Sequence, residues 1–243
     1  MPRRTGPIDN LTSQEIDQAL RLLDEAIGRS ELLMSVAPLR FITYGGMLAV
    51  AVFHTRQSTE DIDVLLDPSV YEAEEYRDEL EDVVRGIAEE GNYKSDWFND
   101  ELKLFIGRGM RQQLFFDSFE QHIIAFEGAN MVIYAGSLDF GLERKLRRLQ
   151  ERRGDLRGTK DASDAVAIVH QMKGESAHPL GAEYVRSLDR NGFKIPIGQR
   201  AIEAVSQDYI VTYQSQGIAE MSWDEKHGQH KYLDLAGKWV WNE

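Results

Sequence analysis

The sequence of 243 residues predicts a mixed α/β fold of the α+β kind. Short apolar runs bounded by turn residues fill the first half, which is typical of sheet strands that alternate with helices. From Leu138 onward the apolar residues recur at helical spacing, and residues 231–241 alternate polar and apolar around a glycine, as a hairpin does. We therefore expect a mixed sheet flanked by helices in residues 1–136, followed by a mainly helical region with a terminal hairpin in residues 137–243.

Composition excludes several classes of protein. Hydrophobic residues make up 42% of the chain, which is enough for a substantial core. No run of eighteen apolar residues occurs, and the N-terminus is polar, so we expect a cytoplasmic protein without a membrane span. There is no cysteine, which excludes thiolate chemistry. The net charge of −13 repels phosphate backbones, so extended nucleic-acid binding is not expected.

The first predicted helix begins at a capping box formed by Thr12 and Glu15. Its apolar face carries Ile16, Leu20, Leu23 and Ile27. A strand follows at 41–44 and leads directly into Gly45 and Gly46, after which the apolar stretch 47–53 predicts a buried helix.

Further strands are predicted at 62–66, 114–116, 123–126 and 131–134, where short apolar runs are separated by turn-like residues. The charged stretch 70–90 predicts a surface helix. Residues 97–100 form either a packed corner or the wall of a ligand pocket. Trp239 and Trp241 are expected to fasten the terminal hairpin to the body of the protein.

Residues 45–66 contain the elements of a nucleoside triphosphate site. Gly45 and Gly46, placed between a strand and a helix, let the backbone approach phosphate oxygens closely. Asp61 and Asp63 are two positions apart on a predicted strand, so their side chains leave the same face of the sheet. Two carboxylates on one face are suited to a hard cation, Mg²⁺ or Mn²⁺.

The same stretch resembles the nucleotidyltransferase superfamily, whose fold is that of DNA polymerase β, in the branch that contains AbiEii-like abortive-infection toxins. The matching residues are Gly45, Gly46, Ala49, Arg56, Thr59, Asp61 and Asp63. The resemblance implies that Asp61 and Asp63 are catalytic and hold the metal. It also implies that Arg56 and Thr59 join the two glycines in binding the nucleotide.

A second block of the chain is similar to the helical, basic stretch of this family. It comprises Leu142, Lys145, Leu146, Arg152 or Arg153, Lys160, Asp161 and Asp164. Residues 144–160 hold eight basic and two acidic residues in an otherwise acidic chain. The resemblance implies that Lys145, Arg153 and Lys160 bind phosphate, and that Asp161 and Asp164 support Lys145 and Arg153.

The chain departs from the family pattern in two places. Met47 stands where many members carry a serine or threonine after the two glycines. Catalytic members also use a third carboxylate on a neighbouring strand, for which Asp117, after the predicted strand 114–116, is the first choice and Glu127 the second.

The resemblance implies transfer of a nucleoside monophosphate from an NTP to an acceptor, with release of pyrophosphate. A small molecule, an RNA end and a protein side chain are all compatible with the sequence as acceptors. The alternative is a catalytically inactive member of the fold that binds a nucleotide or a partner protein. This alternative is favoured by Met47 and by a third carboxylate that the sequence does not place.

Overall fold

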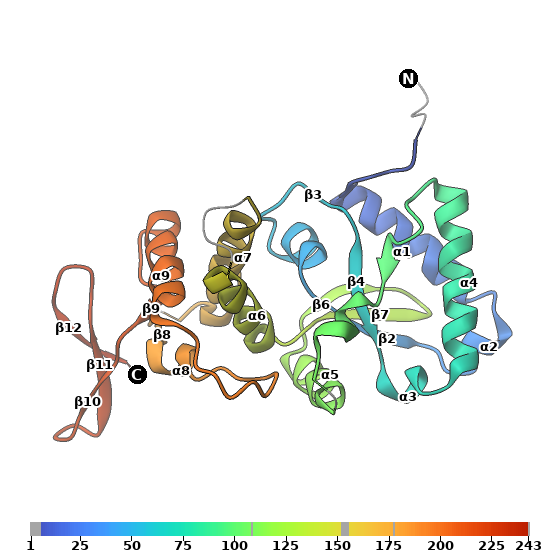
Figure 1. Ribbon diagram of the computed structural model, residues 1–243. Coiled ribbons are helices and arrows are strands. Elements are labelled where there is room, and N and C mark those ends of the chain that lie inside the picture. Colours follow the sequence, from blue (N-terminus) through green and yellow to red (C-terminus); the bar gives the residue numbers. More distant parts are fainter. Residues whose placement is uncertain (1–5, 108, 152–155, 177, 243) are drawn as a thin grey trace. The chain divides into compact units, whose positions relative to one another are not determined.

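The computed structural model describes residues 6–107, 109–151, 156–176 and 178–242, and it shows a mixed α/β protein (Figure 1). The chain divides into two compact units, residues 1–137 and 138–243. No helix in these described ranges combines the length and apolarity needed to cross a membrane.

The elements of unit 1 follow the predicted alternation of strands and helices. They are β1 (Leu11–Thr12), α1 (Ser13–Ile27), α2 (Glu31–Met34), β2 (Leu39–Thr43), the π-helical turn η1 (Leu48–Val52), β3 (Ser58–Thr59), β4 (Ile62–Leu66), α3 (Pro68–Tyr71), α4 (Glu74–Gly91), β5 (Phe98–Asn99), the 3₁₀ turn η2 (Glu101–Phe105), α5 (Met110–Gln121), β6 (Ile124–Glu127) and β7 (Met131–Ala135). The capping box predicted at the start of α1 is present, with Thr12 as the N-cap and Glu15 closing it.

The central sheet of unit 1 has five strands in the order β5-β4-β2-β7-β6. It is mixed, because β2 pairs antiparallel with β4 and parallel with β7. Helices α1 and α4 pack on one face and form the main apolar core with the buried side chains of the sheet. On the other face α5 contacts β7, where the ring of Phe119 lies 4.9 Å from that of Tyr134.

The strand predicted at residues 114–116 is wrong, because these residues lie in the middle of α5. Leu114, Phe115 and Ser118 are the buried residues of this helix, a spacing that matches one helical face. A run of three apolar residues is too short to distinguish a strand from a helix by its period. The other predicted strands of unit 1 are confirmed within about two residues, the usual uncertainty of element boundaries.

A buried carboxylate ties α1 to the turn between β6 and β7. Asp24, 8% exposed, accepts hydrogen bonds from the backbone N–H groups of Ala129 (3.0 Å), Asn130 (2.8 Å) and Met131 (2.8 Å). A Cβ atom at Gly128 would lie 2.3 Å from the carboxylate, so only glycine fits there. The turn therefore depends on a side chain from the first helix.

Unit 2 is mainly helical and ends in a small sheet. Its elements are α6 (Leu138–Glu151), α7 (Leu156–Lys173), β8 (Leu180–Gly181), α8 (Ala182–Arg186), α9 (Gln199–Tyr213), β9 (Ile218–Ala219), β10 (Ser222–Asp224), β11 (Gln229–Leu233) and β12 (Trp239–Asn242). Helices α6, α7 and α9 pack against one another. The predicted terminal hairpin is formed by β11 and β12, and β10 adds a third strand.

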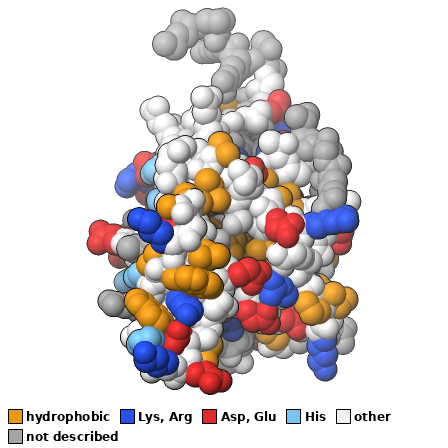
Figure 2. Space-filling view, turned by 90° about the vertical axis from the view of Figure 1, so that its left-hand side faces the viewer, with side chains coloured by type: hydrophobic (Ala, Val, Ile, Leu, Met, Phe, Trp, Pro, Cys, Tyr) orange, Lys and Arg blue, Asp and Glu red, His pale blue; other side chains and the backbone are white. Residues whose placement is uncertain are grey.

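Trp239 does not fasten the terminal sheet as expected, because it is 55% exposed, whereas Trp241 is partly buried and its ring lies 4.7 Å from that of His227. Tyr232 on the other face of β11 is 6% exposed and its ring lies 6.2 Å from that of His178. Since side chains alternate between faces of a strand, Tyr232 packs on the face opposite to Trp239. Figure 2, which views this end of the protein, shows apolar side chains exposed among charged ones.

Candidate functional site

The two glycines predicted to cradle phosphate lie between β2 and a short helical segment at residues 46–52. Gly45 has a φ of +72°, a left-handed conformation that side chains rarely adopt, and its carbonyl accepts a hydrogen bond from the backbone N–H of Ala49 at 3.2 Å. A Cβ atom at Gly45 would lie 3.7 Å from a carboxylate oxygen of Asp63. The turn therefore brings the Gly45 backbone next to one of the predicted metal ligands.

Gly46 makes the closest approach in this region. A Cβ atom at this position would lie 1.9 Å from Oγ1 and 2.8 Å from Cβ of Thr59, which is 7% exposed. The structure thus brings together Gly45, Gly46, Thr59 and Asp63, four residues predicted from the sequence to form one site. Arg56 is partly exposed in the segment between η1 and β3.

We expect Gly46→Ala to destabilise the protein by about 1–3 kcal/mol, since the methyl group overlaps Thr59 and forces one backbone away from the other. The measurement is the free energy of unfolding in urea. Gly86→Ala is the matched control: Gly86 lies within α4 with no atom near its missing Cβ, so alanine there should stabilise the helix by about 0.5–1 kcal/mol. Equal stability of the Gly46 variant and the wild type would contradict the close contact with Thr59.

Asp61 and Asp63 flank the buried side chain of Ile62 at the start of β4. Asp61 immediately precedes the strand and Asp63 lies within it, and both are partly exposed. The pKa of Asp61 is raised to about 6, first by burial and then by the nearby charges of Asp63 and Glu60. The hydroxyl of Thr43 donates to the Asp63 carbonyl at 2.7 Å, which fixes the strand at this point. The pair is a concentration of negative charge that a cation would relieve.

Neither candidate for the third carboxylate completes this pair. Asp117 lies on α5 and not on a strand, and its Oδ1 accepts a hydrogen bond from Gln113 at 2.7 Å, one helical turn away. Glu127 is exposed on β6, the edge strand three positions from β4, a distance of about 14 Å at the usual strand spacing. Among the described residues, no three His, Cys, Asp or Glu side chains are grouped closely enough to hold a metal ion.

The residue that the sheet places beside Asp63 is Asn99. Strands β4 and β5 are parallel, with Ile62 opposite Phe98 and Asp63 opposite Asn99. The Asn99 side chain accepts from the backbone N–H of Glu101 at 3.0 Å and donates to the Asp96 carbonyl at 3.1 Å. Sequence reasoning missed this neighbour because strand register is set by contacts between distant segments. The only local sign was the pair of aromatic residues that precedes it.

The basic block predicted to bind phosphate lies in unit 2. Lys145 on α6 is 7% exposed, and its ammonium forms ion pairs with Asp161 at 3.1 Å and, at still closer range, with Asp164. Arg148 also pairs with Asp161, at 2.5 Å. The two aspartates thus hold Lys145, which agrees with the supporting role implied by the resemblance. Lys160 is exposed on α7, and Arg153 lies outside the described residues.

Comparison of the chain with models of protein families, with curated proteins and with solved structures finds no match.

Proposed function

We propose that this protein is a metal-dependent nucleotidyltransferase built on a polymerase-β-type core in unit 1. The observation that carries the proposal is the contact between the left-handed turn at Gly45 and the carboxylate of Asp63, with Thr59 packed on Gly46 alongside. Four residues from three separate segments meet at the end of β2, as a site for a triphosphate and its cation requires.

The side chains present fit a divalent cation. Asp61 and Asp63 offer hard oxygen ligands, which Mg²⁺ and Mn²⁺ prefer. Burial, followed by the charge of Asp63, raises the pKa of Asp61, and a bound cation would favour its charged form. The amide oxygen of Asn99 is the neighbouring oxygen on β5. When bound, the cation would neutralise triphosphate charge and stabilise the departing pyrophosphate.

Each residue of the proposed site has a distinct task. Asp61 and Asp63 hold the cation. The backbone of Gly45 and Gly46 lies directly against the triphosphate, because glycine has no side chain to keep the two apart. Thr59 fixes the position of Gly46, while Arg56 supplies positive charge for the phosphates. Lys145 is not needed for this assignment, because its ammonium is already held by two carboxylates of unit 2.

The direct test is release of pyrophosphate from the four NTPs in the presence of Mg²⁺ and a pool of acceptors that includes RNA ends, proteins and small hydroxyl compounds. We expect release that depends on one class of acceptor and transfers the nucleoside monophosphate to it. Absence of release with every acceptor, in folded protein that binds NTP, would contradict the enzymatic proposal.

Binding of NTP should itself require the cation. Two adjacent carboxylates repel a triphosphate, so we expect titration calorimetry to show binding with Mg²⁺ or Mn²⁺ and a loss of at least about tenfold in affinity in excess EDTA. Restoring the metal should restore the affinity. The same affinity with and without EDTA would remove Asp61 and Asp63 from the nucleotide site.

A second candidate function is binding of a nucleotide or a partner protein without catalysis. The position of Asn99 favours it, because an amide residue stands opposite Asp63 on the neighbouring strand and no three acidic or histidine side chains of the described residues are grouped to hold a metal ion. NTP binding that depends on Mg²⁺, combined with no pyrophosphate release for any acceptor, is the result expected of this alternative.

A further inference from the structure

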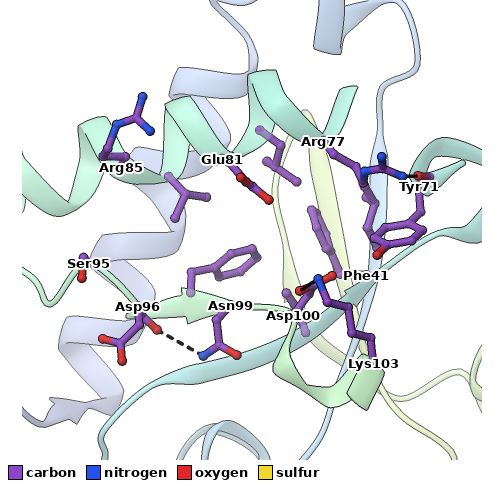
Figure 3. Close-up of a pocket in the computed structure, with 15 residues that line it drawn as sticks. Phe41, Tyr71, Arg77, Glu81, Arg85, Ser95, Asp96, Asn99, Asp100 and Lys103 are labelled. Atoms are coloured by element: carbon purple, nitrogen blue, oxygen red, sulfur yellow. Dashed lines mark hydrogen bonds and ion pairs between the residues drawn. The ribbon is translucent and has the colours of Figure 1, made fainter. Parts of the chain in front are cut away.

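A cavity of unit 1 lies on the face of the sheet that α4 covers, and its volume is about 390 Å³. Its apolar walls come from Phe41, Val64, Leu66 and Phe98 of the sheet and from Leu80 and Val84 of α4. Figure 3 shows these elements enclosing the space, with charged side chains around it. A cavity of this size with apolar walls and a few polar groups is typical of a small-molecule site.

This cavity and Asp63 lie on opposite faces of the sheet, although Asn99 at the end of β5 also lines the cavity. Side chains alternate along β4, so Val64 and Leu66 point into the cavity while Asp63 points to the opposite face. Phe41 and Leu66 are cross-strand partners and lie on the cavity side together. The sheet therefore stands between the cavity and Asp63.

Three cations gather around Tyr71 at one end of the cavity. The guanidinium of Arg77 lies 4.9 Å from the centre of the Tyr71 ring, and that of Arg111 lies 3.7 Å from it. Lys103 lines the cavity from η2 and also lines a neighbouring cavity of about 340 Å³ together with Tyr71 and Arg111. Such a grouping is unexpected in a chain with a net charge of −13.

The two arginines are not neutralised by carboxylates. Arg77 donates to the Tyr71 carbonyl at 2.6 Å and Arg111 to the Leu66 carbonyl at 2.8 Å, and neither forms an ion pair with an acidic side chain of the described residues. A guanidinium has five N–H donors, so each retains donors for a ligand. Burial lowers the pKa of Arg111, and the nearby Tyr71, Asp100 and Glu72 act in the opposite direction.

The charged side chains that line the cavity are balanced in number, with Arg77, Arg85 and Lys103 against Glu81, Asp96 and Asp100. Lys103 pairs with Asp100 at 2.8 Å, and Arg85 pairs with Asp82 at 2.5 Å on the exposed side of α4. Glu81 and Asp96 are exposed and make no ion pair with a described residue. Among the three basic side chains, Arg77 is the one that forms no ion pair with a described carboxylate, and Figure 3 places it beside Tyr71.

From these observations we infer that the cavity binds a small organic carboxylate with an aromatic or branched aliphatic body. The body lies between α4 and the sheet against Phe41 and Phe98, and the carboxylate is held by Arg77. A guanidinium matches a carboxylate through paired N–H donors, which is why Arg77 is the principal contact. This site goes beyond the proposed nucleotide chemistry and does not depend on it.

The test uses two probes with the same apolar body and opposite charges, hydrocinnamate and phenylpropylamine. Titration of the full chain, followed by ¹H–¹⁵N NMR, should show saturable binding of hydrocinnamate with shifts in the amides of α4 and β5, and at least about tenfold weaker binding of the amine. Equal or tighter binding of the amine would overturn the assignment. So would failure of hydrocinnamate to bind at millimolar concentration to folded protein.

Matched variants identify the contact. Arg77→Met should weaken hydrocinnamate binding on the order of ten to a hundredfold, because it removes the charge-assisted contact. Arg85 is on the same helix and also lines the cavity, but it is already paired with Asp82. Arg85→Met should therefore change the affinity for hydrocinnamate less than about twofold. Val84→Phe, which fills the cavity without removing charge, should also abolish binding. Equal effects of Arg77→Met and Arg85→Met would overturn the role of Arg77. Urea unfolding verifies that each variant is folded.

Discussion

Asp61→Asn and Asp63→Asn are each expected to lower the rate of nucleotidyl transfer at least about a thousandfold. Each variant removes one carboxylate charge from the proposed cation site while keeping the volume of the side chain. Loss of the charge stabilisation that a bound metal provides is worth several kcal/mol, and about 1.4 kcal/mol corresponds to a factor of ten in rate. The measurement is pyrophosphate release at saturating NTP and Mg²⁺, with the acceptor found in the screen.

Stability separates loss of function from loss of fold in this experiment. The carboxylate of Asp61 is disfavoured in the folded protein by burial and by Asp63, so its replacement with an amide should leave the free energy of unfolding unchanged or higher. Asp78→Asn, at an exposed position of α4, is the control for a general change in charge and should retain full activity. Wild-type turnover in the Asp61, Asp63 double variant would refute the assigned site.

Lys145→Met is expected to destabilise unit 2 by about 3–5 kcal/mol. Asp161 and Asp164 are 5% and 2% exposed, so removal of the ammonium between them takes a cationic partner from two buried carboxylates. Breaking a buried ion pair by deleting one partner has a cost of about this size. Hydrogen exchange of the amides in α6 and α7, together with urea unfolding, measures the effect in the unit where it arises.

Two further variants test the cause of this loss. Lys160→Met removes a charge from the exposed side of α7 and should change stability by less than about 0.5 kcal/mol. Combining Lys145→Met with Asp164→Asn removes one of the two stranded charges and should recover part of the stability. If Lys145→Met is as stable as the wild type, the ammonium is not the group that neutralises the two aspartates.

The local part of the candidate site could be predicted from the sequence. The strand β2, the two glycines and the strand β4 are contiguous, and each is marked by a short-range signal: an apolar run, a glycine pair, or alternation of buried and exposed residues. These signals also predicted that Asp61 and Asp63 flank a buried residue. The contact between Gly46 and Thr59 follows from the antiparallel pairing of β2 with β4, which brings the segment before β4 back to the glycine turn after β2.

The neighbour of Asp63 on the next strand could not be predicted in the same way. Asn99 stands opposite Asp63 through the register of β5 on β4, and register depends on packing between segments far apart in the sequence. Asp117 was assigned from a three-residue apolar run, which carries no period and proved to be part of α5. The incorrect predictions therefore concern segments whose structure is decided by tertiary contacts and not by a local sequence pattern.

The bond network of Asp24 has a consequence for the synthesis of this protein. The carboxylate is 107 residues ahead of Met131, the last of its three donors, so helix α1 leaves the ribosome long before the turn that satisfies it. Contacts between such distant residues close late in folding. Until then the carboxylate remains hydrated and the nascent helix lacks its final anchor. Helix α1 therefore gains its bond to the turn between β6 and β7 only after that turn has been synthesised.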